Sequence, residues 1–395
     1  MVHILFVSLL SGETMHDFTY YNPTRIEFGR GKENDIGRYI KEAGIENVLL
    51  VYGTGSIKQS GLYEKTIASL QKNGIAYAEL DGVVSNPLLS RVNDGIKIAK
   101  AQKLQAVLGV GGGSVADSAK AIAAGARYDG DVWDFFIHKA EITEALPVFT
   151  VMTLAATASE MNGNSVVMND DTKQKYSIGS VLVNPVVSVV NPELMATVTP
   201  EYLAYSAVDI IAHSIEIYFT ASDHPHFNSR IVESIVKSVI ETTEILMKDP
   251  TDYDARGEFA WVATQALNGL TPAGTAGGSF PNHMIEHALS ALYNVAHGAG
   301  LSVVIPAWMK WYKDQNPAQF ERFAKEVFNA EGADAGIEKL ESWFAKIGSP
   351  VTLKDAGIPR DGIDALAENA GSLAKLWGMG DLYSNEVIAE ILKKA

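Results

Sequence analysis

The alternation of short strand-like runs with helical stretches constrains the fold of this 395-residue chain more than any other feature. Runs rich in apolar and β-branched residues recur between Ile45 and Pro192, and each is followed by a turn or a helical segment. This order is typical of βαβ units, so it predicts an α/β architecture with a mostly parallel sheet. The predicted strands cover residues 47–52, 75–80, 105–110, 147–152 and 186–190.

The pattern changes after Asn191-Pro192, where strand signals almost disappear. Thr199 and Pro200 predict a helix start, with Thr199 as N-cap and Pro200 at the first helical position. Further predicted helices cover residues 204–219, 228–247, 255–268, 282–293, 317–328 and 336–346. We therefore predict an α/β domain at 15–192, an all-helical domain at 193–395 and a possible N-terminal extension at 1–14.

Charge and composition exclude several classes of function. The net charge is −15 and no lysine- or arginine-rich run is present, which argues against nucleic acid or an anionic membrane as partner. The chain has no cysteine, so disulfides and thiolate metal ligands are excluded and any metal must use His, Asp or Glu. The apolar start at 1–10 is short and has no basic residues ahead of it, and no later run reaches about 18 apolar residues. We expect a cytoplasmic protein.

Two pairs of possible metal ligands lie four residues apart, Asp209 with His213 and His283 with His287. Residues at this spacing share one face of a helix, and imidazole and carboxylate suit divalent iron or zinc. Each pair alone could also be an ordinary hydrogen-bonded polar pair. His297 would lie roughly 21 Å from His283 on one straight helix. Both can bind one ion only if the chain bends between them, and we expect Gly298 to lie in a loop there.

A glycine-rich turn, Gly111-Gly-Gly-Ser114, follows a predicted strand and opens a helix. One interpretation is a phosphate cradle, because glycines let backbone N–H groups approach an anion at a helix N-terminus. The other is a tight turn with Ser114 as N-cap and Asp117 as its capping-box partner. The two interpretations are compatible.

A second glycine-rich edge closes the first strand of the α/β half at Gly53. Sites that bind NAD often place an acidic side chain where the ribose 2′-hydroxyl lies. Here the strand ends in glycine, with Ser56 and Lys58 close behind. This combination leaves space, a hydroxyl donor and positive charge for a 2′-phosphate, so it favours NADP(H).

Together these segments resemble the iron-containing, or group III, alcohol dehydrogenases from about Phe18 to the C-terminus. The resemblance rests on Gly111-Gly-Gly-Ser-Val-Ala-Asp-Ser-Ala-Lys120, Thr157-Ala-Ser-Glu160, Asn191-Pro-Glu, Asp209-Ile-Ile-Ala-His213-Ser-Ile-Glu216 and His283-x3-His287-x9-His297-Gly298. Two further segments, Tyr52-Gly-Thr-Gly-Ser56 and Thr264-Gln-Ala-Leu-Asn-Gly269, are similar to NADPH-dependent butanol dehydrogenases and broad-range aldehyde reductases.

The resemblance implies a dinucleotide-binding α/β domain beside an all-helical metal-binding domain, with the active site between them. It assigns the four metal ligands to Asp209, His213, His283 and His297, and makes His287 a pocket histidine near substrate that is not a ligand. It assigns Gly112, Gly113, Ser114 and Asp117 to the pyrophosphate turn and Asn86, Thr153 and Lys175 to the cofactor groove, in addition to Gly53 and Ser56 named above. NAD-dependent relatives carry an aspartate where this chain has Gly53. Thr157-Ala158-Ser159 departs from the commoner Thr-Gly-Ser form, which weakens contacts assigned to that loop.

The expected reaction is hydride transfer between NADP(H) and a primary alcohol, such as butanol, or its aldehyde. Fe²⁺, or Zn²⁺ in its place, would act as a Lewis acid on the substrate oxygen. His287 would either relay a proton or shape the pocket. The alternative is a non-redox, metal- and NAD-dependent sugar-phosphate cyclase of the same architecture. A cyclase needs a basic cluster for the substrate phosphate, and none lies beside the ligand histidines in the sequence.

Partners and the other histidines complete the expectations. We expect a small-molecule substrate, no nucleic-acid or membrane partner, and a homodimer. His224 and His226 flank a proline and are expected in a surface loop. His3, His16 and His138 have no evident partner in the sequence.

Overall fold

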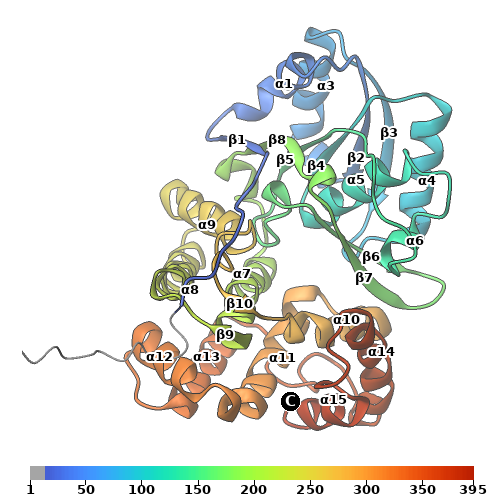
Figure 1. Cartoon of the computed structure of the whole chain (residues 1–395). Coiled ribbons are helices and arrows are strands. Elements are labelled where there is room, and N and C mark those ends of the chain that lie inside the picture. The colour runs from blue at the N-terminus through green and yellow to red at the C-terminus, as the bar shows by residue number, and fades with distance from the viewer. Residues whose placement is uncertain (1–13) are drawn as a thin grey trace, which may run out of the picture.

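The computed structural model describes residues 14–395 and divides into a half built on a sheet and a half built of helices (Figure 1). The apolar run at 1–10, His3 and all but the last residue of the possible extension at 1–14 lie outside the described residues. Among the residues described, no helix is long and apolar enough to cross a membrane.

The sheet has six strands in the order β1-β8-β5-β4-β2-β3, and every neighbouring pair is parallel. Its strands are β1 (Arg25–Phe28), β2 (Asn47–Gly53), β3 (Ala76–Val83), β4 (Ala106–Gly111), β5 (Val148–Met152) and β8 (Pro185–Val190). The predicted parallel α/β architecture is confirmed. Five of these strands match the predicted runs, whereas the edge strand β1 was missed.

Helices cover both faces of the sheet (Figure 1), which explains why the inner strands β2, β4, β5 and β8 are mostly apolar. Leu50 and Leu108 are opposite each other in the register and face a cluster with α1 and α3, whereas Leu49 and Val107 face α4 and α5. The helices of this half are α1 (Ile36–Glu42), α2 (Ser56–Gln59), α3 (Leu62–Lys72), α4 (Leu89–Ala101), α5 (Gly113–Gly125) and α6 (Trp133–Phe136). Short 3-10 turns are η1 (Lys32–Asp35), η2 (Ser159–Met161), η3 (Val181–Val183) and η4 (Pro192–Met195).

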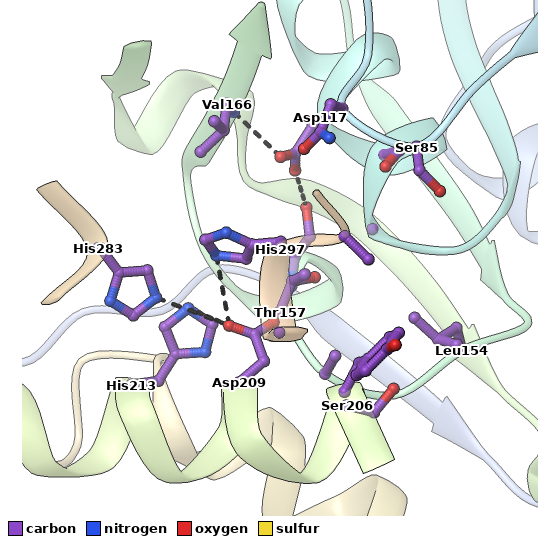
Figure 2. Close-up of a pocket in the computed structure, with 18 of the residues that line it drawn as sticks. Ser85, Asp117, Leu154, Thr157, Val166, Ser206, Asp209, His213, His283 and His297 are labelled. Atoms are coloured by element: carbon purple, nitrogen blue, oxygen red, sulfur yellow. Dashed lines mark hydrogen bonds and ion pairs between the residues drawn. The ribbon is translucent and has the colours of Figure 1, made fainter. Parts of the chain in front are cut away.

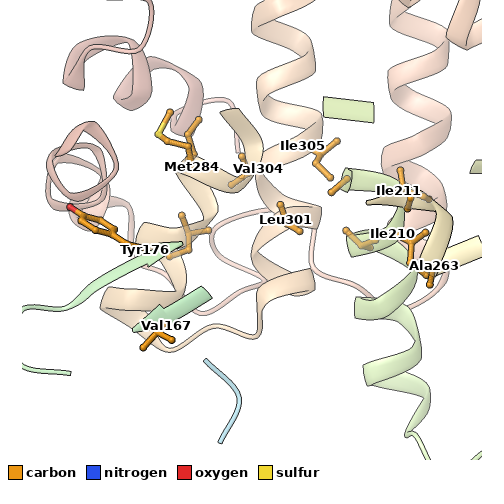
Figure 3. Close-up of a cluster of buried hydrophobic side chains, with 14 of the residues drawn as sticks. Val167, Tyr176, Ile210, Ile211, Ala263, Met284, Leu301, Val304 and Ile305 are labelled. Atoms are coloured by element: carbon orange, nitrogen blue, oxygen red, sulfur yellow. The ribbon is translucent and has the colours of Figure 1, made fainter. Parts of the chain in front are cut away.

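An antiparallel hairpin, β6 (Asn164–Asn169) and β7 (Gln174–Gly179), leaves the sheet half and reaches the helices. Sequence analysis missed it, because polar residues interrupt both strands. Its inner side chains, Val167 and Tyr176, belong to the same buried cluster as Met284 of the helical half (Figure 3). The hairpin therefore joins the two halves through a shared apolar core.

The helical half confirms the predicted helical architecture. Thr199 caps its first helix by accepting a hydrogen bond from the N–H of Tyr202, with Pro200 in the first turn as predicted. The helices are α7 (Pro200–Thr220), α8 (His226–Leu246), α9 (Tyr253–Ala266), α10 (Pro281–Tyr293), α11 (His297–Tyr312), α12 (Pro317–Phe328), α13 (Ala333–Lys346), α14 (Ile363–Leu376) and α15 (Asn385–Leu392). The remaining elements are η5 (Lys313–Gln315), η6 (Arg360–Gly362), β9 (Ala221–Asp223) and β10 (Ala276–Gly277). Sequence analysis missed α11, α14 and α15.

Helix α7 lies at the centre of this half and packs against α8, α9, α10 and α11. Most of its residues between Leu203 and Phe219 are buried, and Ile210 and Ile211 pack beside Leu301 and Ile305 of α11 (Figure 3). A polar side chain in this buried part of α7 is stable only with a partner. Asp209 and His213, which are buried on this helix, therefore each need a polar partner or a bound ligand.

Candidate metal and cofactor site

Four predicted ligand residues converge where α7, α10 and α11 meet (Figure 2). Asp209 Oδ1 lies 3.5 Å from His213 Nε2, 3.6 Å from His283 Nε2 and 3.5 Å from His297 Nε2. These separations are longer than good hydrogen bonds. Asp209 Oδ1 therefore faces the three imidazole nitrogens without a hydrogen bond to any of them, and the donors of Asp209, His283 and His297 all lie within 4.8 Å of one another.

The separations of the three imidazole nitrogens from Asp209 Oδ1 suit donors that share a metal ion with this carboxylate. Ligand distances of about 2.0–2.2 Å at a tetrahedral centre place the donors roughly 3.3–3.6 Å apart, and the observed separations from Asp209 Oδ1 match this range. Asp209 Oδ1 and His283 Nε2 are buried and have no hydrogen-bond partner. Such atoms are costly unless a ligand satisfies them.

The chain bends between His283 and His297, as a shared centre requires. Helix α10 ends at Tyr293, Asn294 adopts a left-handed φ of 53°, and α11 begins at His297. Gly298, however, lies inside α11, so its predicted place in a loop is wrong. A Cβ there would lie 2.1 Å from the backbone oxygen of Tyr205. Glycine is present because the first turn of α11 lies directly against α7.

Two fully buried glutamates that sequence analysis missed hold two of the histidines. Glu216 Oε1 lies 2.9 Å from His283 Nδ1, and Glu286 Oε2 bonds His297 Nδ1. Each glutamate follows a candidate ligand histidine by three residues, in His213-x-x-Glu216 and His283-x-x-Glu286, but bonds a different candidate ligand, His283 for Glu216 and His297 for Glu286. This repeated spacing within apolar helices is the signal that could have revealed them.

Lys175 lies deeper than a residue that only lines a cofactor groove. Its Nζ is 3.2 Å from Glu286 Oε2, 3.0 Å from Ser290 Oγ and 3.1 Å from His297 Nδ1, and its side chain is buried. The lysine comes from β7, whereas its partners come from α10 and α11. The hairpin therefore carries one positive charge from the sheet half to the ligand cluster.

The charge of the buried cluster favours a divalent cation. With the histidines neutral, the carboxylates of Asp209, Glu216 and Glu286 and the ammonium of Lys175 leave a net charge of −2. Burial lowers the pKa of His283, but the carboxylates of Asp209 and Glu216 outweigh this and raise it to about 9. These carboxylates therefore favour positive charge at the donors, and a divalent ion would supply it.

A cavity of about 170 Å³ opens beside the donors and is lined by both halves of the chain. Of the predicted cofactor residues, those that line it are Asn86, Gly113, Ser114, Asp117 and Lys175. Gly112 and Thr153 adjoin it at the carboxyl ends of β4 and β5, and Thr153 donates its N–H to Gly111 O. Gly53 and Ser56 lie outside the lining, at the carboxyl end of β2, which neighbours β4. Ligands of open α/β sheets bind along this edge.

The glycine-rich turn differs in detail from the predicted capping box. Helix α5 begins at Gly113 with Gly112 as N-cap and has no side-chain cap, so Ser114 is not the N-cap. The buried Asp117 carboxylate instead accepts from Ser159 Oγ at 2.7 Å and from the N–H of Val166 at 3.0 Å (Figure 2). A Cβ at Gly113 would lie 2.6 Å from the Thr157 side chain. The uncapped helix N-terminus at the cavity suits an anion.

The loop that departs from the commoner Thr-Gly-Ser form keeps a glycine-like backbone. Ala158 has φ 50° and ψ 18°, the left-handed region that an L-residue adopts at a cost. The loop is nevertheless fixed, because Asn162 Nδ2 donates to Thr157 O and the N–H of Ser159 donates to Thr157 Oγ1. Alanine at this position therefore does not prevent the turn that glycine would favour.

His287 lines the same cavity but stands apart from the four donors. Its ring is 5.8 Å from that of His297 and meets the Trp377 ring edge-on at 5.7 Å. Its Nδ1 is buried without a hydrogen-bond partner. Burial and the nearby charge of Lys175 hold the pKa of His287 well below its usual value, so the imidazole is neutral near pH 7.

The remaining described histidines lie outside the cavity lining, and the expectation that His16 has no partner is wrong. His16 has a partner, because its Nε2 lies 2.8 Å from Asp223 Oδ2. His224 and Pro225 lie in the connection before α8, where His224 is half-buried with Asn316 Nδ2 3.0 Å from its Nε2, whereas His226 is exposed at the first residue of α8. His138 has a positive φ of 56° and is remote from the cavity lining.

Family models match both halves of the chain. Residues 23–192 match the model described as iron-containing alcohol dehydrogenase, and residues 203–395 match the C-terminal model of the Fe-containing alcohol dehydrogenase family. The chain belongs to the iron-containing alcohol dehydrogenase family. The resemblance inferred from the sequence motifs is thereby confirmed, and alcohol dehydrogenase chemistry with a nicotinamide cofactor is the common activity of this family.

Individual members of the family support the same assignment. The chain is 43% identical to the probable NADH-dependent butanol dehydrogenase 1 of Bacillus subtilis, over 96% of this chain and 99% of that protein. It is 34% identical to the NADPH-dependent aldehyde reductase YqhD of Escherichia coli, over 89% and 92%. The solved structure of NADH-dependent butanol dehydrogenase A from Thermotoga maritima has a TM-score of 0.95 at 48% identity, covering 97% and 99%. The names of these alcohol dehydrogenases divide between NADH and NADPH.

Proposed function

We propose that this protein is a metal-dependent, NADP(H)-linked alcohol dehydrogenase that interconverts primary alcohols, such as butanol, and aldehydes. The observation that carries the proposal is the meeting of four metal donors, centred on Asp209, with the glycine-rich helix N-terminus at Gly113 in one cavity. An alcohol dehydrogenase needs both parts within reach of one substrate, because hydride leaves or reaches the carbon whose oxygen is polarised.

The proposed metal ligands are Asp209, His213, His283 and His297, and the proposed metal is Fe²⁺, with Zn²⁺ as an alternative. When bound, the ion would supply a Lewis acid to the substrate oxygen and the nicotinamide would supply or accept the hydride. The protein residues orient these groups: Glu216 and Glu286 hold two of the imidazoles, and the apolar helices around α7 exclude water.

His287 is proposed as the proton-handling residue of the cavity. Its low pKa makes it neutral near pH 7, so it would accept a proton during alcohol oxidation rather than begin as a cation. The competing role is to form one wall of the substrate pocket together with Trp377. The pH dependence of kcat in a His287 variant distinguishes the two roles.

The proposed cofactor is NADP(H), bound along the carboxyl edge of the sheet. Gly53 carries no side chain at the end of β2, and Ser56 begins the short helix that follows. Lys58 Nζ lies 5.0 Å from the centre of the Tyr52 ring, so a positive charge stands beside the same strand end. These features suit a ribose 2′-phosphate. The related NADH-dependent enzymes make a direct comparison of the two cofactors necessary.

We also propose a homodimer. Strand β1 is an edge of the sheet, and its outer side has no partner strand among residues 14–395. Phe18 and Tyr21, in the segment before it, are 54% and 71% exposed. A second copy would cover this open edge and the exposed aromatic side chains, both of which are unusual on a monomer. Light scattering coupled to gel filtration would measure the mass.

The cyclase alternative lacks the cation that it needs. Lys175 is the one lysine or arginine in the cavity lining, and its ammonium is already bonded to Glu286, Ser290 and His297. A substrate phosphate would find no free positive side chain there. No observation therefore favours this activity over alcohol dehydrogenation.

Absorbance at 340 nm with butyraldehyde and either NADPH or NADH tests the proposal directly. We expect aldehyde-dependent oxidation of NADPH, loss of the rate after metal removal by a chelator, and recovery when Fe²⁺ or Zn²⁺ is restored. A higher kcat/KM with NADH than with NADPH would refute only the proposed preference for NADP(H). No aldehyde-dependent oxidation of either cofactor by the metal-loaded protein would refute the proposed function.

A further inference from the structure

Glu216 makes more contacts with His283 than a simple ion pair would require. Its Oε1 accepts the backbone N–H of His283 at 2.9 Å and lies at the same distance from Nδ1 of that residue. Its Oε2 accepts Nδ2 of Asn282 at 2.9 Å. One carboxylate oxygen therefore holds both the backbone and the ring of His283, which fixes the direction of Nε2 toward Asp209.

Glu286 has a different set of partners around His297. Its Oε1 accepts from Ser290 Oγ, and its Oε2 faces both His297 Nδ1 and Lys175 Nζ. A Cβ at Gly300 would lie 2.8 Å from Glu286 Cγ, so glycine leaves the space that this side chain occupies. Lys175 Nζ is itself only 3.1 Å from His297 Nδ1.

This arrangement creates a choice of tautomer for His297. An ammonium has donors only, so Lys175 can bond Nδ1 only if that nitrogen carries no proton. A carboxylate has acceptors only, so Glu286 bonds Nδ1 only if that nitrogen carries the proton. When Nδ1 bonds Lys175, the proton of the neutral ring is on Nε2, which then cannot bind a metal. When Nδ1 bonds Glu286, the proton is on Nδ1, and Nε2 is free to act as a ligand.

We propose that Glu216 and Glu286 are positioning residues that keep the protons of His283 and His297 on Nδ1, and that Glu286 does so against the competing Lys175. The inference rests on the proposed metal centre and deepens it. Glu286 Oε2 accepts hydrogen bonds from both the Lys175 ammonium and His297 Nδ1. The ammonium therefore has an acceptor other than Nδ1, and His297 keeps the tautomer whose Nε2 can bind a metal.

A purely structural role is the competing explanation, because both glutamates are buried and Glu216 also binds the start of α10. Glu233 offers a matched control in the same half of the chain. It is equally buried, on α8, and is bonded to Arg322 and to the hydroxyl of Tyr218, away from the cavity lining. A structural glutamate of this kind should affect stability without affecting metal affinity.

The experiment compares Glu216→Gln, Glu286→Gln, Glu233→Gln and the double variant Glu286→Gln with Lys175→Met. Zinc affinity is measured by competition with a chelator at one fixed pH, Co²⁺ spectra report the ligand geometry, and thermal melts of the metal-free proteins report folding. We expect the first two variants to lose about 10- to 100-fold in zinc affinity, and Glu286→Gln to lose more. Removing Lys175 should restore part of the loss, because the competing donor is gone. Glu233→Gln should melt earlier and keep the wild-type affinity.

The outcomes separate this inference from the proposed function. Wild-type zinc affinity and Co²⁺ spectra in folded Glu216→Gln and Glu286→Gln would overturn the positioning role, and so would an equal loss of affinity in Glu233→Gln. No recovery in the double variant would overturn the competition with Lys175. A wild-type protein that binds neither Zn²⁺ nor Co²⁺ would instead refute the metal centre itself, and the proposed function with it.

Discussion

Replacing Gly298 with alanine tests whether close contact between α11 and α7 sets the metal geometry. A Cβ at this position would lie 2.1 Å from the backbone oxygen of Tyr205 and 2.6 Å from its carbonyl carbon. These are backbone atoms, so no side-chain rotation relieves the contact. Separations below 3.0 Å are not tolerated, so the two helices must move apart by about 0.9 Å, from 2.1 to 3.0 Å.

Two opposing free-energy terms decide whether Gly298→Ala gains or loses stability. Alanine in place of glycine would favour a helix by up to about 1 kcal/mol, whereas overpacking a close contact costs about 1–3 kcal/mol. We expect a net loss of stability. The shift also exceeds the roughly 0.2 Å tolerance of metal–ligand distances, and His297 directly precedes the substituted residue. A misplacement near 1 Å lowers rates by about 100-fold, so kcat/KM should fall by that order.

The assay pairs zinc affinity and butyraldehyde kinetics with urea unfolding of the metal-free protein. Gly336→Ala is the control, because its Cβ would lie 2.7 Å from Ala324 Cβ in a contact between α13 and α12, which carry no site residue. This control should lose stability and keep its zinc affinity. Gly298→Ala with wild-type zinc affinity and kcat/KM would refute the claim that this contact positions His297.

The remaining predictions concern single residues. Gly53→Asp should repel the 2′-phosphate and shift the ratio of kcat/KM for NADPH over NADH by orders of magnitude; an unchanged ratio would place the ribose elsewhere. Asp209→Ala and His283→Ala should lose the metal in elemental analysis, whereas His287→Ala should keep it; the opposite pattern for the two histidines would exchange their roles. Burial lowers the pKa of Lys120 from 10.5 in the unfolded chain to about 8 in the folded protein. Between these two pH values the unfolded chain binds more protons than the folded protein, so the contribution of Lys120 to the free energy of unfolding rises with pH. The unfolding free energy of wild type minus that of Lys120→Met should rise by about 3 kcal/mol across this pH range, and a flat difference in urea titrations would contradict the assignment.

The fold could be predicted where local pattern and tertiary structure agree. Central strands such as β4 are buried on both faces, so their sequences are continuous apolar runs that stand out. Strand β1 and the β6–β7 hairpin carry polar or charged residues at exposed positions, and only pairing with distant partners defines them as strands. Helix α11 was missed because it follows α10 after three residues, and a break this short is set by tertiary packing.

The meeting of the four candidate ligand residues could be predicted in part, because two of them are spaced four residues apart on one helix. Asp209 and His213 share a helix face whatever surrounds them. The contacts of Glu216 and Glu286 could not be predicted, because each bonds a histidine on a different turn or helix, and the pairing depends on how α7, α10 and α11 cross. The burial of Lys175 against Glu286 could not be predicted for the same reason, because it depends on the β6–β7 hairpin, which the sequence did not predict.

The buried charges explain why the two halves of this molecule must be joined where they are. Asp209, Glu216 and Glu286 all come from the helical half, and the nearest compensating side chain, Lys175, comes from the sheet half. Three carboxylates without that lysine would leave a charge of −3 in an apolar core, more than a divalent ion neutralises. With the lysine in place the remainder is −2, which matches Fe²⁺ or Zn²⁺. The hairpin that lines one side of the cavity therefore also fixes the charge that the proposed metal ion would balance.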